Sequence, residues 1–205
     1  MKPIEKLILS SMYVASISDK TPLEIIKEKT KISDDIIEAK IDEVIANQLL
    51  NEDRETLTEL GRTSLNVVLA GGVFDIIHPG HIHTLNAAKD LGDVLVVVIA
   101  TDKTAEKMKK RLPLHTQDQR KTLVDALLMV DLSVIGHEDD IFKTVELIRP
   151  QIIALGYDQM HQEKSITEGC KKINLNITVA RLQSPIPEIS SSIIEKKYGD
   201  RIHDI

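Results

Sequence analysis

The sequence predicts an α/β protein in which a doubly wound, Rossmann-like parallel sheet follows a small helical domain. Three observations lead to this expectation. After residue 65, short runs of consecutive apolar residues alternate with helical segments, as in strands buried on both faces. A glycine-containing turn follows the first of these strands. Before residue 65, apolar residues recur mainly at helical spacing. We therefore expect two domains, spanning residues 1–64 and 65–205.

The first domain is expected to contain three helices and a short strand–turn–strand. One helix lies close to the N-terminus, a second begins at the cap Thr21, and a third begins at Ser33. The strand–turn–strand is expected within residues 50–58. The domain closes with the string LTELGR at residues 57–62, and the pattern as a whole resembles a winged-helix domain.

The charge of the third helix argues against nucleic acid as a partner. Winged helices often read DNA with one helix, but residues 34–47 carry five acidic side chains and one basic side chain, Lys40. Such a helix repels phosphates. The net charge of −6 points the same way, because non-specific nucleic-acid affinity comes from neutralising many phosphates. We therefore expect this domain to serve assembly or regulation.

The second domain is expected to alternate five strands with helices, giving a parallel sheet covered on both faces. In such a sheet, functional residues collect where the strands end at their carboxyl edge. The expected strands are residues 67–69, 94–99, 132–135, 152–155 and 177–180, and the expected helices lie near 80–91, 117–130, 140–148 and 162–173.

Composition excludes a membrane span and an internal disulfide. No apolar run approaches the length that crosses a bilayer, and the first residues are too polar for a secretory signal, so we expect a cytoplasmic protein without membrane association. Cys170 is the one cysteine in the chain, which excludes a cysteine-based metal site. We expect it to be an inert packing residue.

The segment 72–81 carries the most chemical information. Glycine lacks a Cβ, so the strand end can turn sharply and let an anion approach the backbone. Pro79 suits the first turn of a helix, where free N–H groups and the helix dipole favour negative charge. His78 and His81, three positions apart, are expected on one side of that turn, whereas His83 points elsewhere. Imidazole can donate to phosphate oxygens whose charge grows during transfer.

This segment resembles the G-x-F-D-x-x-H-x-G-H signature of the nucleotidyltransferase superfamily. Its cytidylyltransferases and adenylyltransferases move a nucleoside monophosphate from a nucleoside triphosphate to a phosphate or carboxylate, releasing pyrophosphate. The matching residues are Gly72, Phe74, Asp75, His78, Gly80 and His81. Many members have Thr or Ser where this chain has Val73, so only backbone contact is expected there. The resemblance implies nucleotide binding by Gly72, Val73, Phe74, His78, Pro79, Gly80 and His81, with His78 and His81 as donors in catalysis.

A basic segment follows the second expected strand. Lysines and one arginine concentrate in residues 103–113 of an otherwise acidic chain, and we expect a loop there that folds over a triphosphate. Taken alone, such a run is usually a solvated surface. Lys109 and Arg111, however, resemble the Lys-x-Arg of archaeal-type FAD synthases, although these often have Gly at the place of Lys110. The resemblance implies that both cations act in catalysis by neutralising the β- and γ-phosphates. Arg120 also matches a family position, with a helix-surface role equally open.

Two later strand ends complete the resemblance. Asp158 lies in the string ALGYDQ, which resembles archaeal-type FAD synthases, although a plain surface turn explains it as well from sequence alone. A carboxylate there can accept hydrogen bonds from ribose hydroxyls or an adenine amine. Ser190 and Ser191 lie in a run that resembles the Ile-Ser-Ser/Thr-Ser/Thr-x-Ile element of the superfamily. The resemblance implies that Asp158 holds the adenosine and that both serines contact the phosphates.

Residues 66–198 as a whole resemble FAD synthases (FMN adenylyltransferases) of the archaeal type. The resemblance implies ATP and FMN as substrates, FAD and pyrophosphate as products, and Mg²⁺ or another divalent metal on the triphosphate. A homodimer is an expectation by analogy with the superfamily. Two alternatives stay open: a cytidylyltransferase acting on a small phosphate such as glycerol 3-phosphate, and a nucleotide-sensing winged-helix transcriptional regulator. The sequence does not locate a flavin pocket, and its candidate stacking residues are Tyr13, Phe74, Phe142, Tyr157 and Tyr198.

Overall fold

The computed structural model describes residues 1–156, 159, 162–183, 193–194 and 197. The chain divides into two compact units. Unit 1 comprises residues 1–67 and 92–94, and unit 2 comprises residues 68–91 and 95–205.

Unit 1 is built from four helices, α1 (Pro3–Ala15), α2 (Pro22–Lys29), α3 (Asp34–Ala46) and α4 (Glu59–Thr63). Thr21 caps α2 as predicted, because its side chain accepts a hydrogen bond from the Glu24 amide at 3.3 Å. The expected strand–turn–strand is reduced to a single antiparallel bridge between Leu50 and Leu57. The winged-helix interpretation of this unit therefore stays a prediction.

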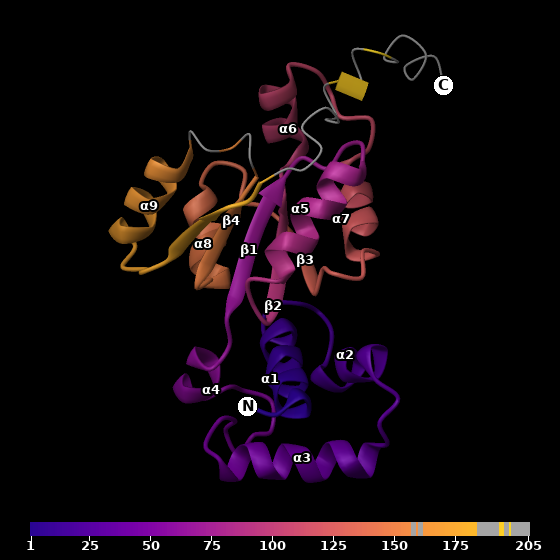
Figure 1. Ribbon diagram of the computed structural model, residues 1–205, viewed down its shortest axis with the longest axis vertical. Helices are drawn as coiled ribbons and strands as arrows, with labels where there is room; N and C mark the ends of the chain where they lie inside the picture. Colours follow the sequence, from indigo (N-terminus) through magenta and orange to yellow (C-terminus); the bar gives the residue numbers. More distant parts are fainter. Residues whose placement is uncertain (157–158, 160–161, 184–192, 195–196, 198–205) are drawn as a thin grey trace. The chain divides into compact units, whose positions relative to one another are not determined.

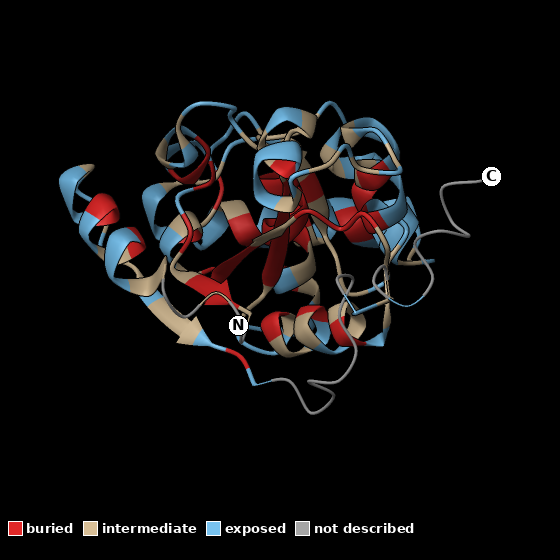
Figure 2. Ribbon diagram, turned by 90° about the horizontal axis from the view of Figure 1, so that it is seen from above, coloured by how far each residue is buried: buried red, intermediate tan, exposed pale blue. Residues whose placement is uncertain are grey.

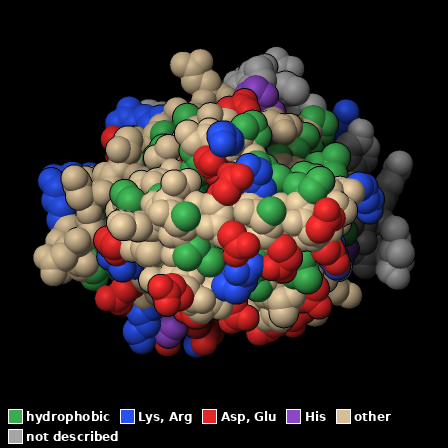
Figure 3. All heavy atoms as spheres, turned by 90° about the horizontal axis from the view of Figure 1, so that it is seen from below, with side chains coloured by type: hydrophobic (Ala, Val, Ile, Leu, Met, Phe, Trp, Pro, Cys, Tyr) green, Lys and Arg blue, Asp and Glu red, His purple; other side chains and the backbone are tan. Residues whose placement is uncertain are grey.

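The outer face of α3 is acidic, as its sequence predicts. Its five carboxylate side chains are exposed. Figure 3 shows Asp and Glu side chains spread over this side of the molecule, with Lys and Arg side chains between them. Arg54, from the turn that follows α3, pairs with both Glu38 and Asp42. A basic side chain of that turn is thus held against carboxylates of α3.

Unit 2 contains a five-stranded parallel sheet with strand order β3-β2-β1-β4-β5, which confirms the predicted doubly wound architecture. The order reverses between β1 and β4, where doubly wound sheets bind their ligands. Helices α5 and α7 cover one face, and α8 and α9 cover the other (Figure 1). The strands are β1 (Val67–Gly72), β2 (Val94–Ile99), β3 (Leu132–Ile135), β4 (Ile152–Leu155) and β5 (Thr178–Arg181), and the helices are α5 (Pro79–Lys89), α6 (Asp102–Lys109), α7 (Gln117–Asp125), α8 (Ile141–Ile148) and α9 (Glu163–Lys172).

The main core lies between the sheet and the α5–α7 layer. Every residue of β2 is buried, which explains why its sequence is continuously apolar instead of alternating. Leu85 and Ala88 of α5 and Val124 of α7 pack on this face. Figure 2 shows the buried residues along the central strands and the exposed ones on the outer sides of the helices. Cys170 is fully buried on α9, and burial raises the pKa of its thiol, which fits a packing role.

Two expected elements of unit 2 differ from the structure. The basic segment after β2 is helical over α6, because Thr101 caps it through the Thr104 amide, and the chain leaves the helix at Lys110 with a φ of 58°. Helix α7 ends at Asp125 rather than near residue 130, because tight turns then lead the chain back so that the Asp131 amide bonds to Leu95 of β2. No helix in the described part of the chain is long and apolar enough to span a bilayer.

Candidate nucleotidyl-transfer site

The turn from β1 into α5 is shaped by Phe74 rather than by the glycines. Gly72 ends β1, and no glycine of the described residues has a positive φ, so the expected glycine-driven turn is wrong in its position. Phe74 instead has a φ of 54°, a left-handed conformation that is costly for a bulky residue. Its ring packs over Gly72, where a Cβ would lie 2.9 Å from the ring. The glycine is therefore needed for close packing against Phe74.

The two histidines of the signature lie together at the start of α5. His78 is the residue before the first turn, Pro79 occupies that turn, and the His78 and His81 ring centroids are 3.9 Å apart. The His81 ring also lies 5.1 Å from that of Phe74, whose core packing fixes one side of the pair. His83 is exposed and stands apart from this site. The sequence spacing therefore identified the correct pair.

Burial lowers the pKa of both histidines, which favours their neutral form at pH 7. It is the largest cause of the fall of the His81 pKa to about 4, and His78 and Lys109 contribute to that fall. The pKa of His78 is lowered by burial and by Lys109. The His78 Nδ1 is buried and has no hydrogen-bond partner among the described residues. A neutral imidazole still carries one N–H, which can donate to a phosphate oxygen without the ring first taking up a proton.

The depressed pKa of His81 predicts a pH-dependent stability. In the unfolded chain this histidine takes up a proton near pH 6.5, whereas in the folded protein it stays neutral down to about pH 4. Unfolding is therefore favoured as the pH falls through this window, by up to about 3 kcal/mol. Urea unfolding at pH 7 and pH 4 should show this loss for the native chain, and less of it for His81→Gln. Equal losses in the two proteins would contradict the assignment.

Lys109 and Arg111 lie at the end of α6, close to the signature. Lys109 is near enough to lower the pKa of both histidines. Arg111 Nη2 lies 2.9 Å from Oδ2 of Asp75, a carboxylate with no exposed surface. The other oxygen of Asp75 accepts hydrogen bonds from the amides of Leu114 and His115, at 2.7 and 3.2 Å. Asp75 therefore ties the segment after α6 to the turn after β1.

Arg120 is a buried structural residue, so the helix-surface alternative is wrong. Its side chain has no exposed surface, and Nη1 donates to the carbonyl of Val73 at 2.6 Å. Its other nitrogens donate to the carbonyl of His115 at 3.1 Å and to Oδ1 of Asp102 at 2.8 Å. Arg120 thus joins the turn after β1, the start of α6 and the start of α7. Neither this role nor that of Asp75 was predicted from the sequence, although Asp75 lies within the signature.

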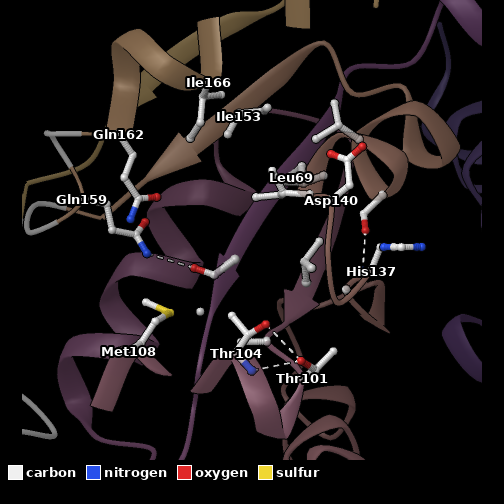
Figure 4. A pocket seen from close by; sticks show the side chains of 18 of the residues that line it. Leu69, Thr101, Thr104, Met108, His137, Asp140, Ile153, Gln159, Gln162 and Ile166 are labelled. Carbon is white, nitrogen blue, oxygen red and sulfur yellow. Dashed lines mark hydrogen bonds between the residues drawn. The ribbon is translucent and has the colours of Figure 1, made fainter. Parts of the chain in front are cut away.

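A cavity of about 240 Å³ opens at the carboxyl ends of β1, β2 and β4. Figure 4 shows Gln159 and Gln162 on one side of Leu69, and His137 and Asp140 on the other. Gln159 accepts from the amide of Gly156 at 3.1 Å and donates to the carbonyl of Gly71 at 3.3 Å. This side chain bridges β4 and β1 at the point where the strand order reverses. The predicted site residues Asp158, Ser190 and Ser191 lie outside the described residues.

Comparison with known proteins places the chain in a family. The cytidylyltransferase-like family model matches residues 69–197, and the chain belongs to this family. This confirms the nucleotidyltransferase class predicted from the signature. Among its relatives, the FAD synthase of Picrophilus torridus is 52% identical over 125 residues, which are 61% of this chain and 89% of the relative. The FAD synthase of Aciduliprofundum boonei is 48% identical over 133 residues, which are 65% of this chain and 80% of the relative.

A solved structure supports the fold assignment. A protein of Thermoplasma volcanium, described as a lipopolysaccharide core biosynthesis protein, is 41% identical with a TM-score of 0.56. The match covers 58% of this chain and 98% of that protein. The same organism has an FAD synthase that is 42% identical over 136 residues, which are 66% of this chain and 95% of the relative.

Proposed function

We propose that unit 2 is an FAD synthase, which transfers AMP from ATP to FMN and releases pyrophosphate. The observation that carries this proposal is the pair of neutral histidines, His78 and His81, at the start of a helix. The pair lies beside the point where the strand order reverses. The chain that holds it is up to 52% identical to FAD synthases. An anion at this position meets the positive end of the α5 dipole.

The reaction needs positioning and charge stabilisation more than acid–base chemistry. A phosphate oxygen of FMN attacks the α-phosphorus of ATP in line, a new P–O bond forms, and the bond to the β-phosphate breaks as pyrophosphate leaves. The attacking phosphate is already ionised at pH 7, so no general base is required. His78 and His81 donate to oxygens around the reacting phosphorus, where negative charge grows.

The β- and γ-phosphates face the cations at the end of α6 in this proposal. Lys109 contributes a charge close to the histidines, and Arg111 adds a second while it remains anchored to Asp75. Asp158 holds the adenosine, and Ser190 and Ser191 contact the phosphates, as the resemblance to the superfamily implies. These three residues lie outside the described part of the chain, so their roles are proposed from sequence.

Mg²⁺ or another divalent metal is proposed to enter with ATP. Magnesium prefers oxygen ligands and commonly combines one or two carboxylates with substrate phosphates. Within the described residues, no group of three or more His, Cys, Asp and Glu residues is arranged to hold a metal. The one fully buried carboxylate of the signature, Asp75, is already engaged with Arg111 and two amides. The triphosphate itself would therefore supply most of the ligands, and the metal would neutralise charge on it.

Unit 1 is proposed to act in assembly or regulation of a cytoplasmic, homodimeric enzyme rather than in DNA binding. Its α3 helix exposes five carboxylates, and Arg54 is held against two of them. The full chain should therefore leave the migration of duplex DNA unchanged at physiological salt. Retarded migration under these conditions would contradict this part of the proposal and favour a regulator.

The function is tested by pairing each of two nucleotides with each of three acceptors. Pyrophosphate release is measured with ATP or CTP in the presence of FMN, glycerol 3-phosphate or 4′-phosphopantetheine. We expect release with ATP and FMN only. Activity with CTP and not with ATP, or with glycerol 3-phosphate in place of FMN, would refute the proposed function.

A further inference from the structure

We propose that the cavity at the carboxyl ends of β1, β2 and β4 binds the isoalloxazine ring of FMN. This inference rests on the proposed function, which requires a place for the acceptor but does not locate it. The cavity and the histidine pair lie on either side of the same strand end. Gly71 and Gly72 line the cavity, and the turn that follows them leads to His78.

The position of the cavity suits an acceptor that reaches across the end of the sheet. The histidines belong to α5, which packs on one face of the sheet, whereas α8 and α9 line the cavity on the opposite face. The ribityl chain of FMN separates its ring from its phosphate. A ring in the cavity would therefore place the phosphate toward the turn after β1, where the transfer is proposed to take place.

The lining of the cavity matches a flat, largely apolar ring system. Leu69 of β1, Val98 of β2 and Ile153 of β4 form its floor, and polar residues line it as well, among them Thr104, Gln162 and the acidic residues 138–140. An apolar cavity with a few polar groups is typical of a small-molecule site. Glycerol 3-phosphate has almost no apolar surface to bury there, so the lining favours the larger acceptor.

A glycine keeps the cavity open beside the floor. A Cβ on Gly136, at the end of β3, would lie 2.9 Å from Cγ1 of Val98, so a side chain there would crowd the floor. The volume of about 240 Å³ lies below the range for small-molecule pockets, which begins at roughly 300 Å³. This volume suits one ring system rather than a whole dinucleotide.

Among the described residues, stacking of an aromatic side chain on the isoalloxazine ring is not expected. Phe74 and Tyr13 are buried in the cores of unit 2 and unit 1, and the side chain of Phe142 packs against Gly169 of α9. Three of the five stacking candidates from the sequence are therefore packing residues. The ring would instead lie against aliphatic side chains, including Ile141 and Met108 at the exposed edge of the cavity.

The test changes the edge of the cavity and leaves its floor intact. Ile141→Asn and Met108→Gln replace exposed apolar side chains that line the cavity, 49% and 56% exposed, so the fold should tolerate them. Leu147→Asn is the matched control, because Leu147 lies on the same helix as Ile141, is 60% exposed and does not line the cavity. The KM values for FMN and ATP are measured with the full chain, and riboflavin affinity is measured by fluorescence quenching.

The double variant Ile141→Asn/Met108→Gln should raise the KM for FMN at least tenfold and weaken riboflavin binding similarly, with the KM for ATP within twofold of the native value. Leu147→Asn should leave all three unchanged. An unchanged KM for FMN, or a raised KM for ATP instead, would overturn the assignment of the cavity. A native chain that forms no FAD would overturn the proposed function, and riboflavin quenching in the native chain and the double variant would then decide whether the cavity binds flavin.

Discussion

Replacing His81 with Ala is expected to lower kcat about 100-fold, equivalent to about 3 kcal/mol of transition-state stabilisation. The imidazole lies between Phe74 on one side and His78 on the other, so the ring is held in place before the substrate arrives. A donor that is already oriented stabilises growing negative charge without reorganisation during the reaction. The loss should appear in kcat, measured as FAD formation at saturating ATP and FMN.

His83→Ala is the matched control for this variant. His83 lies on the same helix, two residues further on, and its side chain is exposed. Its replacement should leave kcat unchanged. If His81→Ala retained the native kcat, His81 would have no role in the chemical step.

Replacing Asp75 with Ala is expected to lower the free energy of unfolding by about 3–5 kcal/mol, because it leaves a largely buried cation without its carboxylate. The Asp75 side chain has no exposed surface, and the Arg111 side chain is 21% exposed. The amides of Leu114 and His115 also lose their acceptor. Urea denaturation at pH 7 measures the change, and activity should fall as well because Lys109 and Arg111 lose their anchor.

Two further variants show whether the loss of stability comes from the buried contacts of Asp75 or from the removal of any negative charge. Asp75→Asn keeps an oxygen that can accept from the two amides but loses the charge toward Arg111, so its stability should lie between those of the native chain and Asp75→Ala. Asp118→Ala removes an exposed carboxylate from the first turn of α7 and should cost at most about 1 kcal/mol. A loss below about 1 kcal/mol for Asp75→Ala would contradict the proposed anchor.

The sheet was predictable from sequence because its signal is local. Strand β2 is continuously apolar and buried throughout, and its predicted bounds are those observed. The same holds for β3 and β4. Helix α6 was missed because its many charged residues hide the helical pattern, although Thr101 followed by Asp102 is a usual helix start. Predicting α6 from the sequence requires giving the Thr101 cap more weight than the many charged residues of the segment.

The site was predictable in part, for the same reason. His78 and His81 are three residues apart on one helix, so their proximity follows from the helix geometry. Their neutrality does not, because it arises from burial by elements distant in sequence. The pairing of Asp75 with Arg111 spans 36 positions, and that of Arg120 with Val73 spans 47. Such contacts depend on the tertiary fold and leave no local pattern.

If the enzyme transfers AMP from ATP to FMN, the α-phosphorus of ATP must end in FAD, and a labelling experiment follows it there. The full chain is incubated with FMN and with ATP that carries radioactive phosphorus in its α-phosphate, and the products are separated by chromatography. We expect label in FAD and none in the released pyrophosphate. Label that stays in ATP, or appears in AMP without FAD, would contradict this transfer.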